Sequence, residues 1–141
     1  MNRPEAPSGA PPPAKAYHSD GTAIDLEALA HQICAQYRDE FPDEQRRYGP
    51  AGMQWCLHDN QYLLAWAVQD ARDGTVLLIE QVEWLSSVLE SRGFPVQRLG
   101  RDLEIAAEIA CSSEELGDLA SFTGQKLSEA AGLELFGDPS D

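Results

Sequence analysis

The chain has 141 residues, with 24 acidic residues against 10 basic ones, so its formal charge is −14 and its isoelectric point is near 4.4. Such a charge repels phosphate backbones and anionic lipid headgroups, which argues against direct binding to nucleic acid or to a membrane surface. Hydrophobic residues make up 43% and charged residues 24% of the chain, a globular mixture that excludes wholesale disorder and a membrane protein. The length suits a single domain.

The cysteines and the N-terminus indicate the compartment. The spacings of 22 and 55 residues between Cys34, Cys56 and Cys111 fit neither a disulfide framework nor a CxxC site. A reduced, cytoplasmic setting is therefore expected. No basic segment followed by an apolar run opens the sequence, and no apolar stretch approaches the roughly 18 residues of a membrane span, so we expect neither export nor membrane insertion.

Both ends of the chain have compositions that differ from its middle. Residues 1–19 contain five of the nine prolines and almost no bulky apolar side chain, so burial cannot offset the entropy lost on ordering them. We expect a disordered Pro-rich tail there, a helical domain over 20–132 and an acidic tail over 133–141. Residues 102–141 hold ten of the acids and one basic residue, which is typical of a solvated face and also suits a basic partner.

The first helix is predicted to start at Thr22, which forms a capping-box-like pattern with Asp25, and to end before Pro42. Its apolar residues recur at i, i+3, i+4, i+7, i+8 and i+11, which places them on one helix face. This stripe consists of Leu26, Leu29, Ala30, Ile33, Cys34 and Tyr37. A polar, basic connection over 43–50 is expected to follow.

Four further segments carry helical patterns separated by short breaks. The second helix is expected over about 51–72 and the third over 75–91. Pro95 suits the first turn of a fourth helix, and a serine at 112–113 ends it and caps a fifth, which stops before Gly132. No segment alternates with period two, so the predicted fold class is all-α: a single bundle of four to five antiparallel helices, small enough to gain from dimerisation.

The second helix is apolar on more than one side. Trp55, Tyr62 and Trp66 lie at i, i+7 and i+11 on one stripe, and His58 and Asp59 fill the turn between them. A second stripe consists of Met53, Leu57, Leu64 and Val68. A helix covered in this way is either central to the bundle or shared with another chain.

The candidate pocket or interface residues are Trp55, His58, Asp59, Tyr62, Trp66 and Trp84. Tryptophans suit such a site, although core packing is their ordinary use. His58 beside Asp59 fits a general base, a metal ligand or a polar cluster facing a ligand. The simpler interpretation is a structural ion pair between Asp59 and Arg98 or Arg101 of the fourth helix.

The signatures of several enzyme classes are missing. The sequence contains no G-x-S-x-G, P-loop, G-x-G-x-x-G or H-E-x-x-H motif and no Glu-x-x-His pair of a di-iron bundle. Cys56 and His58 lie about 200° apart on a helix, so they cannot bind one zinc ion together. Glu104 and Glu108 share a helix face but are expected to face solvent. We therefore predict no catalytic residue, no metal ligand and no cofactor.

The middle of the chain combines three short motifs. Cys56 and Asp59 fit a C-x-x-D element, and QYLL at 61–64 loosely fits an H-L-x-Y-L helix. The segments QVEWL at 81–85 and RGFP at 92–95 fit the pattern Y-V-x-W-L-x-x-L-L-x-x-R-G-x-P. In this combination the chain resembles the helical bundle that precedes the cobalamin-binding Rossmann domain in many bacterial regulators and corrinoid proteins.

This resemblance covers roughly residues 45–112 and implies a regulatory bundle that mediates assembly and covers the upper face of a corrin. In that family a separate Rossmann domain holds the cobalamin through a D-x-H-x-x-G motif, which does not occur in these 141 residues. The resemblance implies that Trp55, Trp66 or Trp84 would contact the corrin if another chain supplied it.

Three hypotheses for function follow. The first is a non-enzymatic regulatory or interaction module that engages a partner protein, or a second copy of itself in a homodimer, through the faces of the second and third helices. The alternative is a sensor domain whose stripe of Trp55, Tyr62 and Trp66, with His58, lines a pocket for a planar or corrin-like ligand. An enzyme built on His58 and Asp59 is the third.

Overall fold

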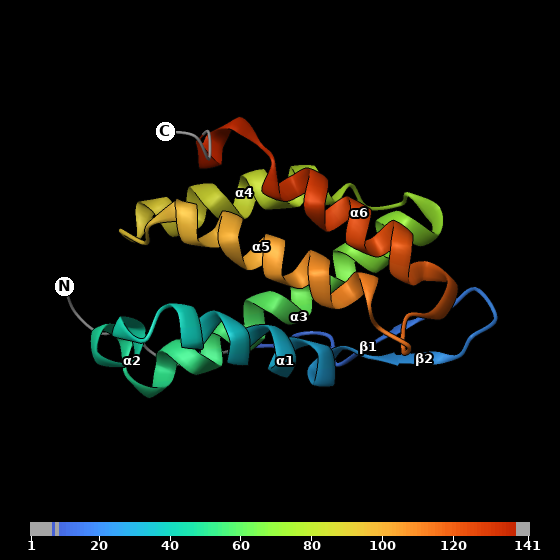
Figure 1. Ribbon diagram of the computed structural model, residues 1–141, viewed down its shortest axis with the longest axis horizontal. Helices are drawn as coiled ribbons and strands as arrows, with labels where there is room; N and C mark the ends of the chain where they lie inside the picture. Colours follow the sequence, from blue (N-terminus) through green and yellow to red (C-terminus); the bar gives the residue numbers. More distant parts are fainter. Residues whose placement is uncertain (1–6, 8, 138–141) are drawn as a thin grey trace.

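The computed structural model describes residues 7 and 9–137, and in this range the chain forms six α-helices, a two-stranded hairpin and two short 3₁₀ helices (Figure 1). The elements are β1 Lys15–Tyr17, β2 Ala23–Asp25, α1 Leu26–Glu40, α2 Asp43–Tyr48, α3 Pro50–Asp73, α4 Leu78–Ser91, α5 Val96–Cys111, η1 Gly117–Leu119, α6 Ala120–Ala131 and η2 Glu134–Phe136. The predicted helical character is confirmed. The described chain has one α-helix more than the largest number expected, together with a hairpin that was not expected.

The predicted start of the first helix at Thr22 is wrong. The hairpin occupies that segment, because β2 pairs antiparallel with β1 and Ala16 lies opposite Ile24. Helix α1 begins after Asp25, whose Oδ1 accepts a hydrogen bond from the Ala28 backbone N–H at 3.0 Å. Asp25 thus acts as the N-cap, and a three-residue strand is too short to show the period-two pattern.

The prediction of a disordered tail over 1–19 is wrong for its last part. Strand β1 is ordered, and the Gln61 side chain donates to the Pro13 carbonyl at 3.1 Å. The Ile24 side chain beneath the hairpin is fully buried. Backbone pairing in the hairpin and the burial of Ile24 offset the conformational entropy that this segment loses on ordering. The proline-rich composition alone does not reveal these two contributions. Residues 1–6 and 8 of the predicted tail lie outside the described part of the chain.

The predicted acidic tail over 133–141 also contains an ordered segment. Leu133 and Phe136 pack against the core, and Phe136 of η2 lies over Gly100 of α5, where a β-carbon would come within 3.0 Å of its ring. The contact is tight, so a β-carbon at position 100 would require the Phe136 side chain to shift. Residues 138–141 lie outside the described part.

The polar segment after Pro42 is a helix rather than the predicted connection. Its first turn carries Asp43 and Glu44 and its last turn Arg46 and Arg47, the charge order that the helix dipole favours. Helix α2 buries Glu44 and Tyr48, so a segment that looks solvated in the sequence contributes two side chains to the interior.

Two helices begin later than predicted. After Gly74, Asp73 Oδ1 accepts hydrogen bonds from the Thr75 N–H at 3.0 Å and the Thr75 hydroxyl at 2.6 Å, and this turn delays α4 to Leu78. A turn and η1 follow α5, so α6 begins at Ala120 and not at a serine cap at 112–113.

The core is aliphatic and lies between three layers of helices. Figure 1 shows α5 across the middle, α1 and α2 on one side of it, α4 and α6 on the other, and α3 running obliquely between the sides. The six residues of the predicted stripe on α1 are all buried, which confirms that face. Among the described residues, no helix has the length and apolar character needed to cross a bilayer.

The closest packing joins α5 to α6 at Gly124. A β-carbon there would overlap Cys111 Sγ and lie 3.1 Å from the Ala107 carbonyl oxygen. We expect Gly124→Ala to lower the free energy of unfolding by about 1–3 kcal/mol, because α5 and α6 must separate to admit the methyl group. Urea denaturation measures this change.

Gly132→Ala is the matched control, because its new methyl group would meet the Glu129 carbonyl oxygen at an ordinary 3.5 Å. Its effect should stay within about 0.5 kcal/mol. Equal losses in the two variants would contradict close packing at Gly124 as the cause.

Candidate functional site

The structure brings all six candidate residues to one groove between α3 and α4. The groove has a volume of about 330 Å³. It is lined by Trp55, His58, Asp59, Tyr62, Trp66, Trp84, Leu85, Val88, Leu89 and Arg92. Because α3 forms one wall and α4 the other, the groove exists only where these two helices pack together.

An aromatic row forms the α3 wall of this groove. The ring centroids of Trp55 and His58 are 5.0 Å apart, those of His58 and Tyr62 5.1 Å, and those of Tyr62 and Trp66 5.5 Å. The Arg92 guanidinium lies 5.4 Å from the centre of the Trp55 ring in a cation–π contact.

The tryptophans do not fill the core, contrary to their ordinary use. Trp55 and Trp66 are partly buried and Trp84 is 58% exposed. On α4 the side chains of Val82 and Leu85 point inward, and Trp84 lies between them on the outer face of the helix. Three large aromatic side chains therefore remain accessible beside an aliphatic core.

The predicted ion pair between Asp59 and Arg98 or Arg101 is wrong. Asp59 Oδ1 lies 3.1 Å from His58 Nδ1 instead. Arg98 binds Glu44 at 2.8 Å, and Arg101 binds Glu40 at 2.7 Å. The two arginines of α5 face the acids of α1 and α2, whereas Asp59 lies on the side of α3 that faces the groove.

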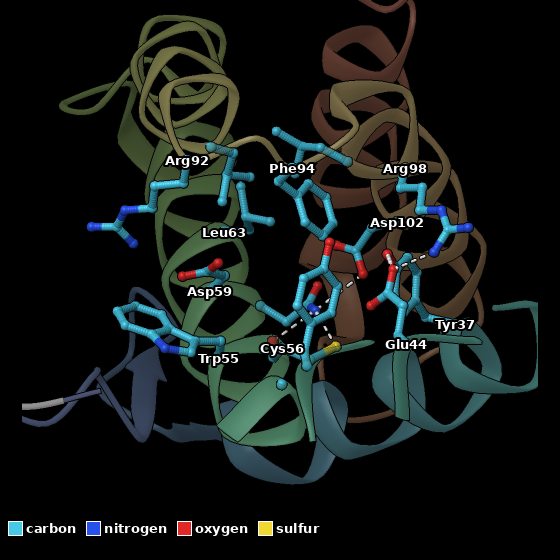
Figure 2. A pocket seen from close by; sticks show the side chains of 15 residues that line it. Tyr37, Glu44, Trp55, Cys56, Asp59, Leu63, Arg92, Phe94, Arg98 and Asp102 are labelled. Carbon is cyan, nitrogen blue, oxygen red and sulfur yellow. Dashed lines mark hydrogen bonds and ion pairs between the residues drawn. The ribbon is translucent and has the colours of Figure 1, made fainter. Parts of the chain in front are cut away.

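A second cavity of about 300 Å³ lies behind the groove, among α1, α2, α3, α5 and the segment after α4 (Figure 2). Its lining residues are Tyr37, Glu44, Tyr48, Gly52, Trp55, Cys56, Asp59, Asn60, Leu63, Leu89, Arg92, Phe94, Arg98, Leu99 and Asp102. Four of them, Trp55, Asp59, Leu89 and Arg92, also line the groove. We call this space the inner cavity.

One side of the inner cavity is closed by an ion-pair cluster. The Tyr37 hydroxyl donates to Glu44 Oε2 at 2.5 Å, and Arg98 Nη1 donates to the same oxygen at 2.8 Å. The cluster joins α1, α2 and α5. Burial and the hydrogen bond to Glu44 raise the pKa of Tyr37, so this phenol remains a donor.

Asp102 is the acid at the centre of the inner cavity. It is 6% exposed, and its Oδ1 accepts a hydrogen bond from Asn60 Nδ2 at 3.1 Å. No basic side chain in the described part of the chain forms an ion pair with it. The pKa of Asp102 is raised to about 7, chiefly by burial; the Asn60 hydrogen bond opposes this rise, and repulsion from Asp59 and Glu44 contributes to it.

Two residues that line this cavity each carry a buried polar atom without a hydrogen-bond partner in the described protein: Tyr48 Oη and Asn60 Oδ1. The orientation of the Asn60 amide is fixed, because its Nδ2 also donates to the Cys56 carbonyl at 2.9 Å and a carbonyl can only accept. Each unpaired buried group costs about 1–3 kcal/mol of stability. Native interiors keep few such groups, so two in one cavity need an explanation.

The buried Cys34 and the partly buried Cys56 form a thiol pair beside Asn60, whose Nδ2 lies 3.5 Å from each sulfur. A hydrogen bond with Cys34 and burial raise the pKa of the Cys56 thiol. A thiol held protonated is a poor nucleophile, which argues against a catalytic cysteine here.

Sequence reasoning missed Asn60 and Asp102 as site residues. A signal was present, because Asn60 lies three residues after Leu57 and four before Leu64, and Asp102 three after Leu99, all on apolar stripes. A polar residue on such a stripe predicts a buried polar site. Tyr48 had no such signal, because its short helix was not expected.

Within residues 7 and 9–137, no three His, Cys, Asp or Glu side chains are grouped as metal ligands would be. Comparison of the chain with protein-family models, curated proteins and solved structures gives no match. The resemblance to the cobalamin-associated bundle therefore stays a prediction, and the functional argument rests on the two sites described above.

The buried carboxyl predicts a pH-dependent stability. Between the ordinary Asp value of 3.8 and about 7, folded Asp102 keeps a proton that the unfolded chain has released. The free energy of unfolding therefore falls as pH rises through this window, by up to about 1.4 kcal/mol per pH unit for this group. Asp102→Asn should remove this contribution, so the variant gains stability over the wild type between pH 4 and pH 7. Urea denaturation across this range measures the difference.

Glu104→Gln, at an exposed acid on the same helix, is the control for a change of net charge. The free energy of unfolding of this variant should follow that of the wild type in parallel between pH 4 and pH 7. Parallel curves for Asp102→Asn and the wild type would show that Asp102 ionises normally and would contradict this assignment.

Proposed function

We propose that this protein is a non-enzymatic interaction module that binds the apolar face of a helix in the groove between α3 and α4. The observation that carries the proposal is the composition of the groove, which gathers three tryptophans, a tyrosine and an arginine. Trp, Tyr and Arg are the residues that contribute most binding energy in protein interfaces. Here they lie partly exposed outside a complete aliphatic core.

The dimensions of the groove suit a helical occupant. The aromatic row runs from Trp55 to Trp66, eleven residues along α3, which corresponds to about 16 Å or three helical turns. A helix of similar length would place its apolar residues against the row and against Trp84. Covering Trp84, which is 58% exposed, would remove its remaining apolar surface from water.

The occupant we propose is a second copy of this chain, which makes the protein a homodimer; a partner protein is the other form of the hypothesis. Trp84 on α4 and Leu77, the residue directly before α4, are both exposed and lie seven residues apart, so they share one side of the helix as an apolar surface that a helical groove recognises. Glu80 and Glu83 lie beside Trp84, so a heterologous partner would carry lysine or arginine next to its apolar face.

The alternative function is a sensor for a planar or corrin-like ligand. It is supported by the open aromatic row, in which the His58 ring lies between Trp55 and Tyr62 within a groove of about 330 Å³. A flat ligand would stack against these rings and Trp84. The resemblance found in the sequence points to the same class of ligand.

Native mass spectrometry of freshly purified protein tests both functions, because it reports subunit number and any retained small molecule. We expect a dimer without an adduct. Trp84→Ala should raise the dimer dissociation constant by at least about tenfold, as removal of an interface hot spot does, with little loss of stability. Sedimentation equilibrium measures the constant and urea denaturation the stability.

Phe122→Ala is the matched control, since Phe122 is also 58% exposed but lies on α6, away from the groove. It should leave association unchanged. A monomer without an adduct would contradict self-association, and equal effects of the two variants would contradict the groove as the interface. A discrete extra mass would favour the sensor.

A further inference from the structure

The inner cavity has the features of a small-molecule site separate from the groove. Its volume of about 300 Å³ lies at the lower end of the range for ligand pockets, and apolar and aromatic side chains form most of its wall. Figure 2 shows Asp102, Asp59 and Phe94 around the same space, contributed by α5, α3 and the segment after α4. The site would therefore take a compact ligand with an apolar body.

The polar groups of this cavity call for a ligand that donates hydrogen bonds. The Asp102 carboxyl and Asn60 Oδ1 are acceptors, and the Tyr48 hydroxyl accepts as well as donates. Arg98, a cation of the lining, is already bound to Glu44 at 2.8 Å and to Asp43 at 3.1 Å. A ligand with several N–H donors would complete the hydrogen bonding of these groups.

The charge balance selects a cation. Two cations line the cavity: Arg98 is paired with Glu44 and Asp43, and the Arg92 guanidinium lies over the Trp55 ring. Asp102, in contrast, forms no ion pair with a basic side chain in the described chain. An anionic ligand would meet Asp59 and Asp102 in a protein whose formal charge is −14. The rings of Tyr48, Trp55 and Phe94 line the cavity as well, and their faces attract a cation that has lost its water.

We propose that the inner cavity binds a small organic cation, a primary or secondary amine with an apolar body, whose ammonium group is held by Asp102, Asn60 Oδ1 and the Tyr48 hydroxyl. A primary ammonium has three N–H donors, which matches these three acceptors in number. Binding would give the buried carboxylate the opposite charge that it lacks and pair the two unpartnered atoms. This site goes beyond the proposed interaction function and does not depend on it.

Binding of an amine at this site would release a proton at neutral pH. Near pH 7 the carboxyl of Asp102 is partly protonated before binding, and an adjacent ammonium favours its ionised form. The titratable and charged groups of this cavity and its wall are Cys34 and Tyr37 of α1, Glu44 and Tyr48 of α2, Cys56 and Asp59 of α3, Arg92 directly after α4, and Arg98 of α5. Asp59 and Glu44 are the acids that oppose its ionisation, so their repulsion also falls when the cation enters.

Isothermal titration calorimetry with butylamine, 2-phenylethylamine and tryptamine tests the proposal, with 2-phenylethanol as the uncharged counterpart of the second probe. We expect at least one amine to bind with a dissociation constant below about 1 mM. 2-Phenylethanol should bind at least about tenfold more weakly than 2-phenylethylamine, because it lacks the charge that pairs with Asp102. Amine affinity should rise about tenfold from pH 6 to pH 8. The measured heat of binding should also depend on the ionisation heat of the buffer, because the buffer takes up the released proton.

Asp102→Asn keeps the acceptor for Asn60 but removes the charge. It should lower amine affinity at least about tenfold, abolish the pH dependence and leave 2-phenylethanol binding unchanged. Glu104→Gln, on the exposed side of α5, and Trp84→Ala, in the groove, should both bind amines as the wild type does. Circular dichroism confirms that each variant is folded.

The outcomes that overturn the proposal are distinct. If none of the three amines binds the folded wild type, or if 2-phenylethanol matches 2-phenylethylamine, the cavity does not recognise a cation. If Asp102→Asn binds amines normally, the amine occupies another site. If Trp84→Ala abolishes amine binding while Asp102→Asn does not, the amine binds in the groove.

Discussion

The hydrogen bond from Asn60 to Asp102 is the polar constraint on which the arrangement of the two sites depends. It joins α3 to α5, whose backbones approach each other closely at few points, so side chains and the inner cavity occupy the space between them. Asn60 also bonds the Cys56 carbonyl within α3, which fixes the rotation of the amide. With this face of α3 held toward α5, its aromatic row faces α4.

This arrangement separates two kinds of apolar surface. Aliphatic side chains from α1, α3, α5 and α6 fill the core, and α5 and α6 approach as closely as Gly124 allows. The tryptophans lie outside it, at the junction of α3 and α4. Since the core is complete without Trp84, that side chain is not needed to fill the interior and is accessible for the contact that we propose.

Local pattern predicted much of the fold, while the sites required tertiary information. The stripe on α1 follows the helical period and is buried throughout, and the helical period of α4 also places Trp84 on its outer face, two residues from Val82. The six groove residues could be proposed because five of them lie along α3 at helical spacing. The inner cavity combines Tyr37, Tyr48, Asn60 and Asp102 from four helices, and no spacing links positions so far apart in the chain. Asp59 was assigned to Arg98 or Arg101 for the same reason, because the true partners of these arginines, Glu44 and Glu40, depend on how α5 faces α1 and α2.

The wall shared by the groove and the inner cavity has an energetic consequence. Trp55, Asp59, Leu89 and Arg92 face both spaces, so a molecule that moves these side chains in one space changes the shape and charge of the other. Thermodynamic reciprocity requires that any resulting change in affinity is the same in both directions. These four shared residues are therefore the place where a coupling free energy between the proposed cation and the proposed partner would arise, without any change in the aliphatic core.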